Sequence, residues 1–132
     1  MKQYVFRLTR GSDLLESIRA FCREKRIRAG CIACCVGCLS EACLRSADGA
    51  TLHSYRERLE IVSVTGTVSE ARCHIHTSLS REDMTLLGGH LCPGCIVNTT
   101  AEVVLCELAG VAFSKTFDPE TGYNELSIET AE

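Results

Sequence analysis

Residues 59–80 read LEIVSVTGTVSEARCHIHTSLS and contain two runs typical of β-strands. The first run, residues 59–68, is rich in valine, isoleucine and threonine, which fit the pleated surface of a sheet. The second run, residues 72–80, contains the sequence HIH, and side chains two positions apart in a strand point to the same face. We therefore expect His74 and His76 side by side on one face, with the intervening isoleucine on the other.

The rest of the chain, read outward from these strands, adds one helix and several more strands. Residues 11–25 carry apolar side chains at helical spacing, and Asp13 and Glu16 resemble a capping pair at the start of the helix. Many short strands and one clear helix predict an α+β fold built on a mostly antiparallel sheet. The other runs with strand character are residues 4–8, 29–44, 96–108 and 111–117.

A chain of 132 residues can close one hydrophobic core but is too short for two ordinary domains, so we expect a single domain over residues 1–132. Within it, residues 79–87 indicate a short helical turn. The glycines and proline of GGHLCPGC, residues 88–95, are typical of irregular backbone. Residues 118–132 predict a polar turn and a loose C-terminus.

The composition narrows the function classes. A net charge of −3 argues against nucleic-acid binding, which draws most of its affinity from Lys and Arg near phosphates. No apolar run reaches the roughly twenty residues of a membrane span, and the first residues lack a signal-peptide core. We therefore expect a cytoplasmic protein without membrane contact, whose ten cysteines are reduced thiols or metal ligands.

Three CxxC spacings raise the possibility of a cysteine metal site. Two lie in residues 31–38, where residues three apart on a strand point to opposite faces, so we interpret these cysteines as small buried apolar residues. In the third, Pro93 and Gly94 can form a turn that brings the sulfurs of Cys92 and Cys95 to one side. Packed thiols, a redox pair and half of a zinc site all remain open for that pair.

His90 follows two glycines that allow its backbone to fold close to the HIH strand. Three neutral imidazoles suit Zn²⁺ and leave a fourth position for water or substrate. Ordinary exposed strand histidines are the alternative. His53 lies in a different strand or hairpin, and we interpret it as a surface residue outside the cluster.

Residues 59–108, together with residues 11–30, resemble the PPC domain of plants and prokaryotes, once catalogued as a domain of unknown function. The likeness runs from about Tyr4 to Phe117, and its most specific parts are the HxH strand, the GGHL turn and the motif TAEVVL. The resemblance implies a compact α+β fold with an antiparallel sheet that assembles as a homotrimer. It also implies a metal site, usually zinc, whose ligands match His74, His76 and His90 by position.

Plant members of this family join the domain to an AT-hook that binds the DNA minor groove. The present chain contains no Arg-Gly-Arg-Pro element, and Glu57 and Leu59 stand where the plant proteins have glycine and phenylalanine. The resemblance therefore does not extend to a transcriptional role.

Two functional hypotheses follow. The first is a metal-dependent enzyme of unidentified substrate, with Glu102 as the first candidate for a catalytic base, Asp83 as the second, and hydrogen bonds from Ser78 and Thr100. The second is a non-catalytic oligomeric binding module, in which the metal stabilises the trimer or senses a small-molecule ligand. The apolar character of both faces of residues 29–39 independently predicts an oligomer.

Overall fold

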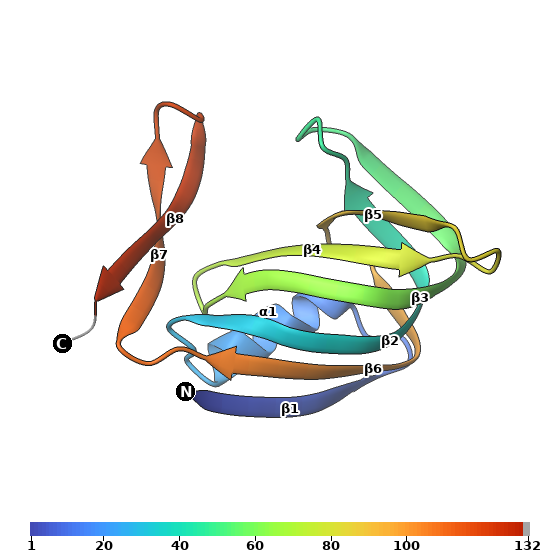
Figure 1. Cartoon of the computed structure of the whole chain (residues 1–132), viewed down its shortest axis with the longest axis horizontal. Coiled ribbons are helices and arrows are strands. Elements are labelled where there is room, and N and C mark those ends of the chain that lie inside the picture. Colours follow the sequence, from blue (N-terminus) through green and yellow to red (C-terminus); the bar gives the residue numbers. More distant parts are fainter. Residues whose placement is uncertain (131–132) are drawn as a thin grey trace.

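The computed structural model describes residues 1–130, which form eight strands and one helix (Figure 1). The eight strands and the single helix confirm the predicted α+β class, although two of the strands are much longer than expected. The elements in chain order are β1 (Lys2–Thr9), α1 (Leu14–Glu24), β2 (Gly30–Arg45), β3 (Leu52–Val68), β4 (Cys73–Ser80), β5 (Leu86–Leu91), β6 (Ile96–Glu107), β7 (Val111–Asp118) and β8 (Tyr123–Thr130).

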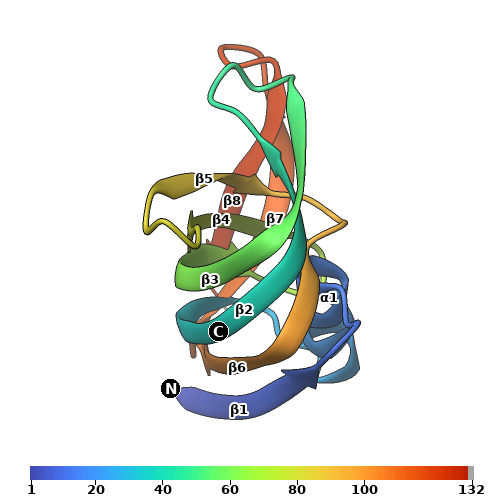
Figure 2. The same cartoon turned by 90° about the vertical axis from the view of Figure 1, so that its right-hand side faces the viewer.

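Six of the strands form one sheet in the order β1-β6-β2-β3-β4-β5, and every pairing in it is antiparallel. Figure 2 shows these strands stacked in that order, with α1 against one side. The end of β2 also pairs with β5, through Leu44 with Leu91 and Arg45 with His90. This last pairing curls the sheet, because it joins a central strand to the edge strand.

Helix α1 covers one face of the sheet and supplies much of the core. Its residues Leu14, Ile18 and Cys22 are fully buried. The side chain of Asp13 accepts a hydrogen bond from the backbone N–H of Glu16 at 2.9 Å, which confirms the predicted cap. Within residues 1–130, no helix is long and apolar enough to cross a membrane.

The opposite face of the sheet carries no helix. Val5, Val36 and Val62 lie there with 77%, 55% and 54% of their surface exposed. His74 and His76 point to this open face as well, because their neighbour Ile75 is buried in the core and side chains alternate along a strand. The side chains of His74 and His76 are therefore accessible from outside the core.

Residues 86–91 correct one prediction, because the glycines expected to mark irregular backbone lie inside β5. Because glycine has no side chain, the backbone of β5 can approach β4 on one side and the end of β2 on the other. A Cβ at Gly88 would lie 2.5 Å from the carbonyl oxygen of Thr77, and a Cβ at Gly89 would lie 2.7 Å from that of Arg45. The segment before β5 forms a tight turn between β4 and β5, rather than the expected helical turn.

The C-terminal segment corrects a second prediction. The polar turn after residue 118 is present, but residues 123–130 form β8, which pairs with β7 along its whole length. Phe113 faces Ile128 and Lys115 faces Leu126 in this hairpin, so apolar residues within a polar sequence have cross-strand partners. Figure 1 shows the hairpin standing apart from the main sheet. The last two residues of the predicted loose C-terminus lie outside the described residues.

Candidate metal centre

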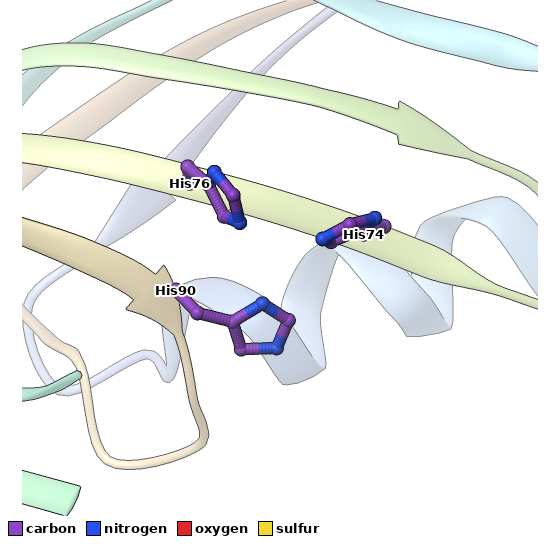
Figure 3. Close-up of side chains that lie close together, drawn as sticks. All are labelled: His74, His76 and His90. Carbon is purple, nitrogen blue, oxygen red and sulfur yellow. The ribbon is translucent and has the colours of Figure 1, made fainter. Parts of the chain in front are cut away.

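The three histidines converge on one point. His74 and His76 come from β4, and His90 comes from β5, where it is paired directly with His76. One potential ligand nitrogen from each lies within 4.8 Å of the others. The ring centroids are 5.0 to 5.5 Å apart. Figure 3 shows the three rings gathered around a common space, with a nitrogen of each turned toward it.

The donor set fits a transition metal. Nitrogens bound to one tetrahedral Zn²⁺ lie about 3.3 Å apart, so small side-chain rotations would close the spread of 4.8 Å. Nδ1 of His90 is buried and has no hydrogen-bond partner within residues 1–130. A buried ring nitrogen without a partner is costly, and a metal ion is a partner that would satisfy it.

Burial and nearby positive charges lower the pKa values of His74 and His90, which favours the neutral imidazole that binds metal. Burial, and then the positive charge of Arg45, lower the pKa of His90 to about 4. Burial, and then the charge of Arg72, also lower the pKa of His74. An Nη of Arg72 lies 3.3 Å from Nδ1 of His74 and, since a guanidinium cannot accept a hydrogen bond, donates to it in the metal-free protein; a metal ion bound to His74 must displace this contact or shift the ring proton.

A cleft of about 540 Å³ opens beside the histidines. It is bounded by β4, β5 and the turn between β2 and β3. The tip of this turn approaches β8, because a Cβ at Gly49 would lie 3.7 Å from the hydroxyl oxygen of Tyr123. The residues that line the cleft are Arg45, Ser46, Ala47, Gly49, His74, His76, Thr77, Ser78, Gly88, Gly89 and His90.

Of the predicted auxiliary residues, only Ser78 lies in this cleft. Glu102 is exposed on β6, which is separated from β4 by β2 and β3, or about 14 Å along the sheet. Thr100 is on the same strand and accepts a hydrogen bond from Arg7. Asp83 lies in the turn at the far end of β4 and accepts hydrogen bonds from Thr85. One chain therefore does not bring these three side chains to the histidines.

Arg45 also lines the cleft, although it was not among the residues predicted from the sequence. Its position depends on the pairing of β2 with β5, which joins residues far apart in the chain. Nothing in the local pattern around SEACLRSADG predicts that pairing, so the sequence carried no signal for this residue.

The cysteines behave differently from the histidines. All ten are unpaired, and the histidine cluster is the only group of three or more metal-type ligands within residues 1–130. Cys35 is buried, as expected, but Cys34 is exposed. Cys95 is a packed thiol whose sulfur lies 3.3 Å from both the backbone nitrogen and the carbonyl oxygen of Cys43.

A curled antiparallel sheet with one helix and a histidine cluster on its open face defines an α+β domain with a candidate metal centre. The model of the Plants and Prokaryotes Conserved (PCC) domain matches residues 1–109, and the chain belongs to this family. The match confirms the resemblance found in the sequence motifs.

Three solved structures show the same fold. A hypothetical protein from Salmonella cholerae-suis has a TM-score of 0.95 and 35% identity, over 98% of this chain and 94% of that chain. A candidate DNA-binding protein from Bacteroides thetaiotaomicron has a TM-score of 0.84 and 28% identity, over 95% and 91%. A metal-containing protein from Archaeoglobus fulgidus has a TM-score of 0.82 and 31% identity, over 96% and 94%.

Two curated relatives are much longer proteins. Each is a bifunctional protein GlmU from a Synechococcus strain, 40% identical over 129 residues, or 98% of this chain. The chain spans about one fifth of their length, 21% in one case and 20% in the other.

Proposed function

We propose that this protein binds a divalent transition metal, with zinc as the first choice, through His74, His76 and His90. The observation that carries the proposal is the convergence of three imidazoles from two strands within 4.8 Å. The metal-containing relative from Archaeoglobus fulgidus supports it. Three protein ligands leave one position of a tetrahedral ion open to the cleft, where water or a small molecule binds.

A metal bound by three imidazoles keeps its full positive charge and, at its open position, acidifies water or polarises a carbonyl. The protein's own residues hold the ion, and the hydroxyl of Ser78 orients the ligand. None of the residues that line the cleft is a carboxylate, and the acid of the same chain whose charge acts on His74 is Glu125 of β8. The lack of a carboxylate in the cleft lining favours ligand binding at the metal over water activation, unless Glu125, or Glu102 of another copy of the chain, acts as the base.

The proposed assembly is a homotrimer that packs through the open face of the sheet. Exposed Val5, Val36 and Val62 on that face support an oligomer, because apolar side chains gain stability when another surface covers them. Light scattering should give about three times the 14.4 kDa of one chain. Val36→Asp should lower that mass, whereas a monomeric wild type would contradict the assembly.

DNA binding is the weaker alternative. The family includes a relative named for that role, but the net charge of −3 and the absence of an Arg-Gly-Arg-Pro element oppose it. Salt-dependent binding to duplex DNA at physiological ionic strength would revive this alternative.

Elemental analysis of tag-free protein tests the metal site, with His53→Ala as a matched control. His53 is exposed and lies outside the cluster, with Nε2 at 3.2 Å from the hydroxyl of Ser46. We expect about one metal per chain in the wild type and in His53→Ala, and little in His74→Ala and His90→Ala. A wild type that contains no metal and takes up no added zinc would contradict the proposal.

A further inference from the structure

Arg45 shares the cleft with the histidines. It is the last residue of β2 and is directly paired with His90 of β5. Directly paired residues in an antiparallel sheet project from the same face with Cβ atoms about 5 Å apart. The backbone therefore places a permanent positive charge next to the proposed metal ligands.

The charge of Arg45 is not neutralised by the protein. Its Nε is buried without a hydrogen-bond partner, and within residues 1–130 Arg45 forms no ion pair. The acid of the adjacent turn, Asp48, already accepts hydrogen bonds from Ser46 and from the backbone N–H groups of Ala50 and Thr51. A buried donor without an acceptor destabilises the fold, which points to an acceptor that arrives with a ligand.

The remainder of the cleft is suited to a small polar molecule. Arg45 is the only charged side chain among the residues that line it. Gly88 precedes His90 by two positions on the same face, so no side chain fills the space beside that histidine. Ser78, paired with Gly88 across the strands, places a hydroxyl at the same level.

We propose that the cleft binds a small carboxylate, whose carboxylate group accepts hydrogen bonds from Arg45 while a second oxygen of the ligand occupies the open metal position. The planar guanidinium fork matches a carboxylate, and the metal and the arginine together attract an anion. The adjacency of Arg45 and His90 requires a short molecule, such as a 2-hydroxy acid. This inference rests on the proposed metal site.

Cobalt-substituted protein provides the test, because the visible spectrum of Co²⁺ responds to a change in its ligands. Lactate is the probe, lactamide is its neutral counterpart, and inorganic phosphate is a competing anion. Arg45→Gln removes the charge, and Arg56→Gln is the matched control because Arg56 is an exposed arginine of β3, with 86% of its side chain accessible. We expect lactate to bind wild type and Arg56→Gln at least tenfold more tightly than lactamide, and Arg45→Gln to lose that preference.

Other outcomes separate the two proposals. If the wild type binds no cobalt, both the proposed metal site and the proposed carboxylate site are contradicted. If cobalt binds but lactate has equal affinity for wild type and Arg45→Gln, or phosphate binds more tightly than lactate, the carboxylate assignment is overturned and the metal site stands.

Thermal unfolding of the metal-free variants distinguishes a ligand-binding arginine from a structural one. Arg45→Gln should be at least as stable as wild type, because it removes a buried donor that has no partner. A marked loss of stability would overturn the inference by assigning Arg45 to the fold.

Should Arg45→Gln not fold, Arg45→Lys keeps the charge without the planar guanidinium fork. Its lactate affinity should fall between those of wild type and a variant without the charge. Equal affinity in wild type and Arg45→Lys would contradict recognition by the guanidinium.

Discussion

Strands β4 and β2 both carry histidine or cysteine, the residue types that bind transition metals in proteins, but only β4 helps to bring such residues together. On β4, two histidines separated by one residue share a face, and β5 adds a third within 4.8 Å. On β2, four cysteines fall within residues 31–38, yet they form no cluster of three within residues 1–130. A spacing of two matches the period of a strand, and a spacing of three does not. On a strand, the spacing therefore matters more than the number of candidate ligands.

Burial has opposite consequences for the two residue types. It raises the pKa of Cys35 to about 11, so the thiol keeps its proton and is a poor ligand. It also contributes most to lowering the pKa of His90 to about 4, so the imidazole stays neutral and ready to bind. The same loss of hydration keeps the cysteine thiol protonated, which opposes metal binding, and keeps the histidine imidazole neutral, which favours it.

The largest expected effect compares the two faces of β4. Ile75 is 1% exposed in the core, while His76 is exposed on the open face. Ile75→Ala should destabilise the metal-free protein by about 3 kcal/mol, because it leaves a cavity in the core. His76→Ala should change stability by less than about 0.5 kcal/mol. Chemical denaturation measures both, and similar losses in the two variants would contradict the assignment of faces.

Zinc affinity gives the next largest effect and compares histidine with cysteine directly. His76→Ala should weaken zinc binding by about 100-fold or more, since it removes a ligand rather than a supporting hydrogen bond. Cys34→Ser, an exposed substitution on β2, should leave the affinity unchanged. Competition with a chromophoric chelator measures both constants. A loss in Cys34→Ser would show that the cysteines take part.

The pH dependence of stability should show a smaller effect. The folded pKa of His90, about 4, lies below its ordinary value of 6.5, so the unfolded chain binds a proton that the folded protein does not. The free energy of unfolding of the metal-free protein should therefore fall as the pH drops from about 6.5 to 4. Above pH 6.5, His90 should cause no loss of stability. Because the His90 side chain is only partly buried and solvent screens it in part, we expect about 1 kcal/mol.

His90→Asn is the control for this pH effect, and urea denaturation at pH 7.5 and 4.5 measures it. The variant should lose less stability than wild type on acidification. Equal losses in the two proteins would show that other groups cause the acid sensitivity.

The smallest expected effect concerns Arg72, which donates to Nδ1 of His74 and adds a positive charge beside the cluster. Arg72→Gln should strengthen zinc binding about threefold at pH 7.5, because it removes repulsion from the ion. Arg58→Gln is the control, since Arg58 pairs with Glu82 away from the histidines. Weaker zinc binding in Arg72→Gln would indicate that Arg72 supports the bound state.

Local periodicity accounts for what the sequence could predict. The apolar spacing and the cap of α1, and the shared face of His74 and His76, depend on neighbouring residues, and the structure confirms them. The family resemblance pointed to His90 by position, and its ring now lies beside the other two. Zinc, the trimer and the role of Glu102 remain predictions.

What could not be predicted depends on contacts between distant residues. Gly88 and Gly89 are typical of loops, and only the close approach of the backbones on either side explains their place in a strand. Residues 123–130 look like a polar tail until β7 provides partners. Arg45 reaches the cleft through the pairing of β2 with β5, which no local pattern reveals.

X-ray absorption at the zinc edge of metal-loaded wild-type protein tests the central claim most directly. The account predicts only nitrogen and oxygen ligands at about 2.0–2.1 Å, with the multiple scattering of imidazole rings. It predicts no sulfur, because the histidines converge and the cysteines do not. A sulfur shell at about 2.3 Å would contradict the account and move the metal site to the thiols.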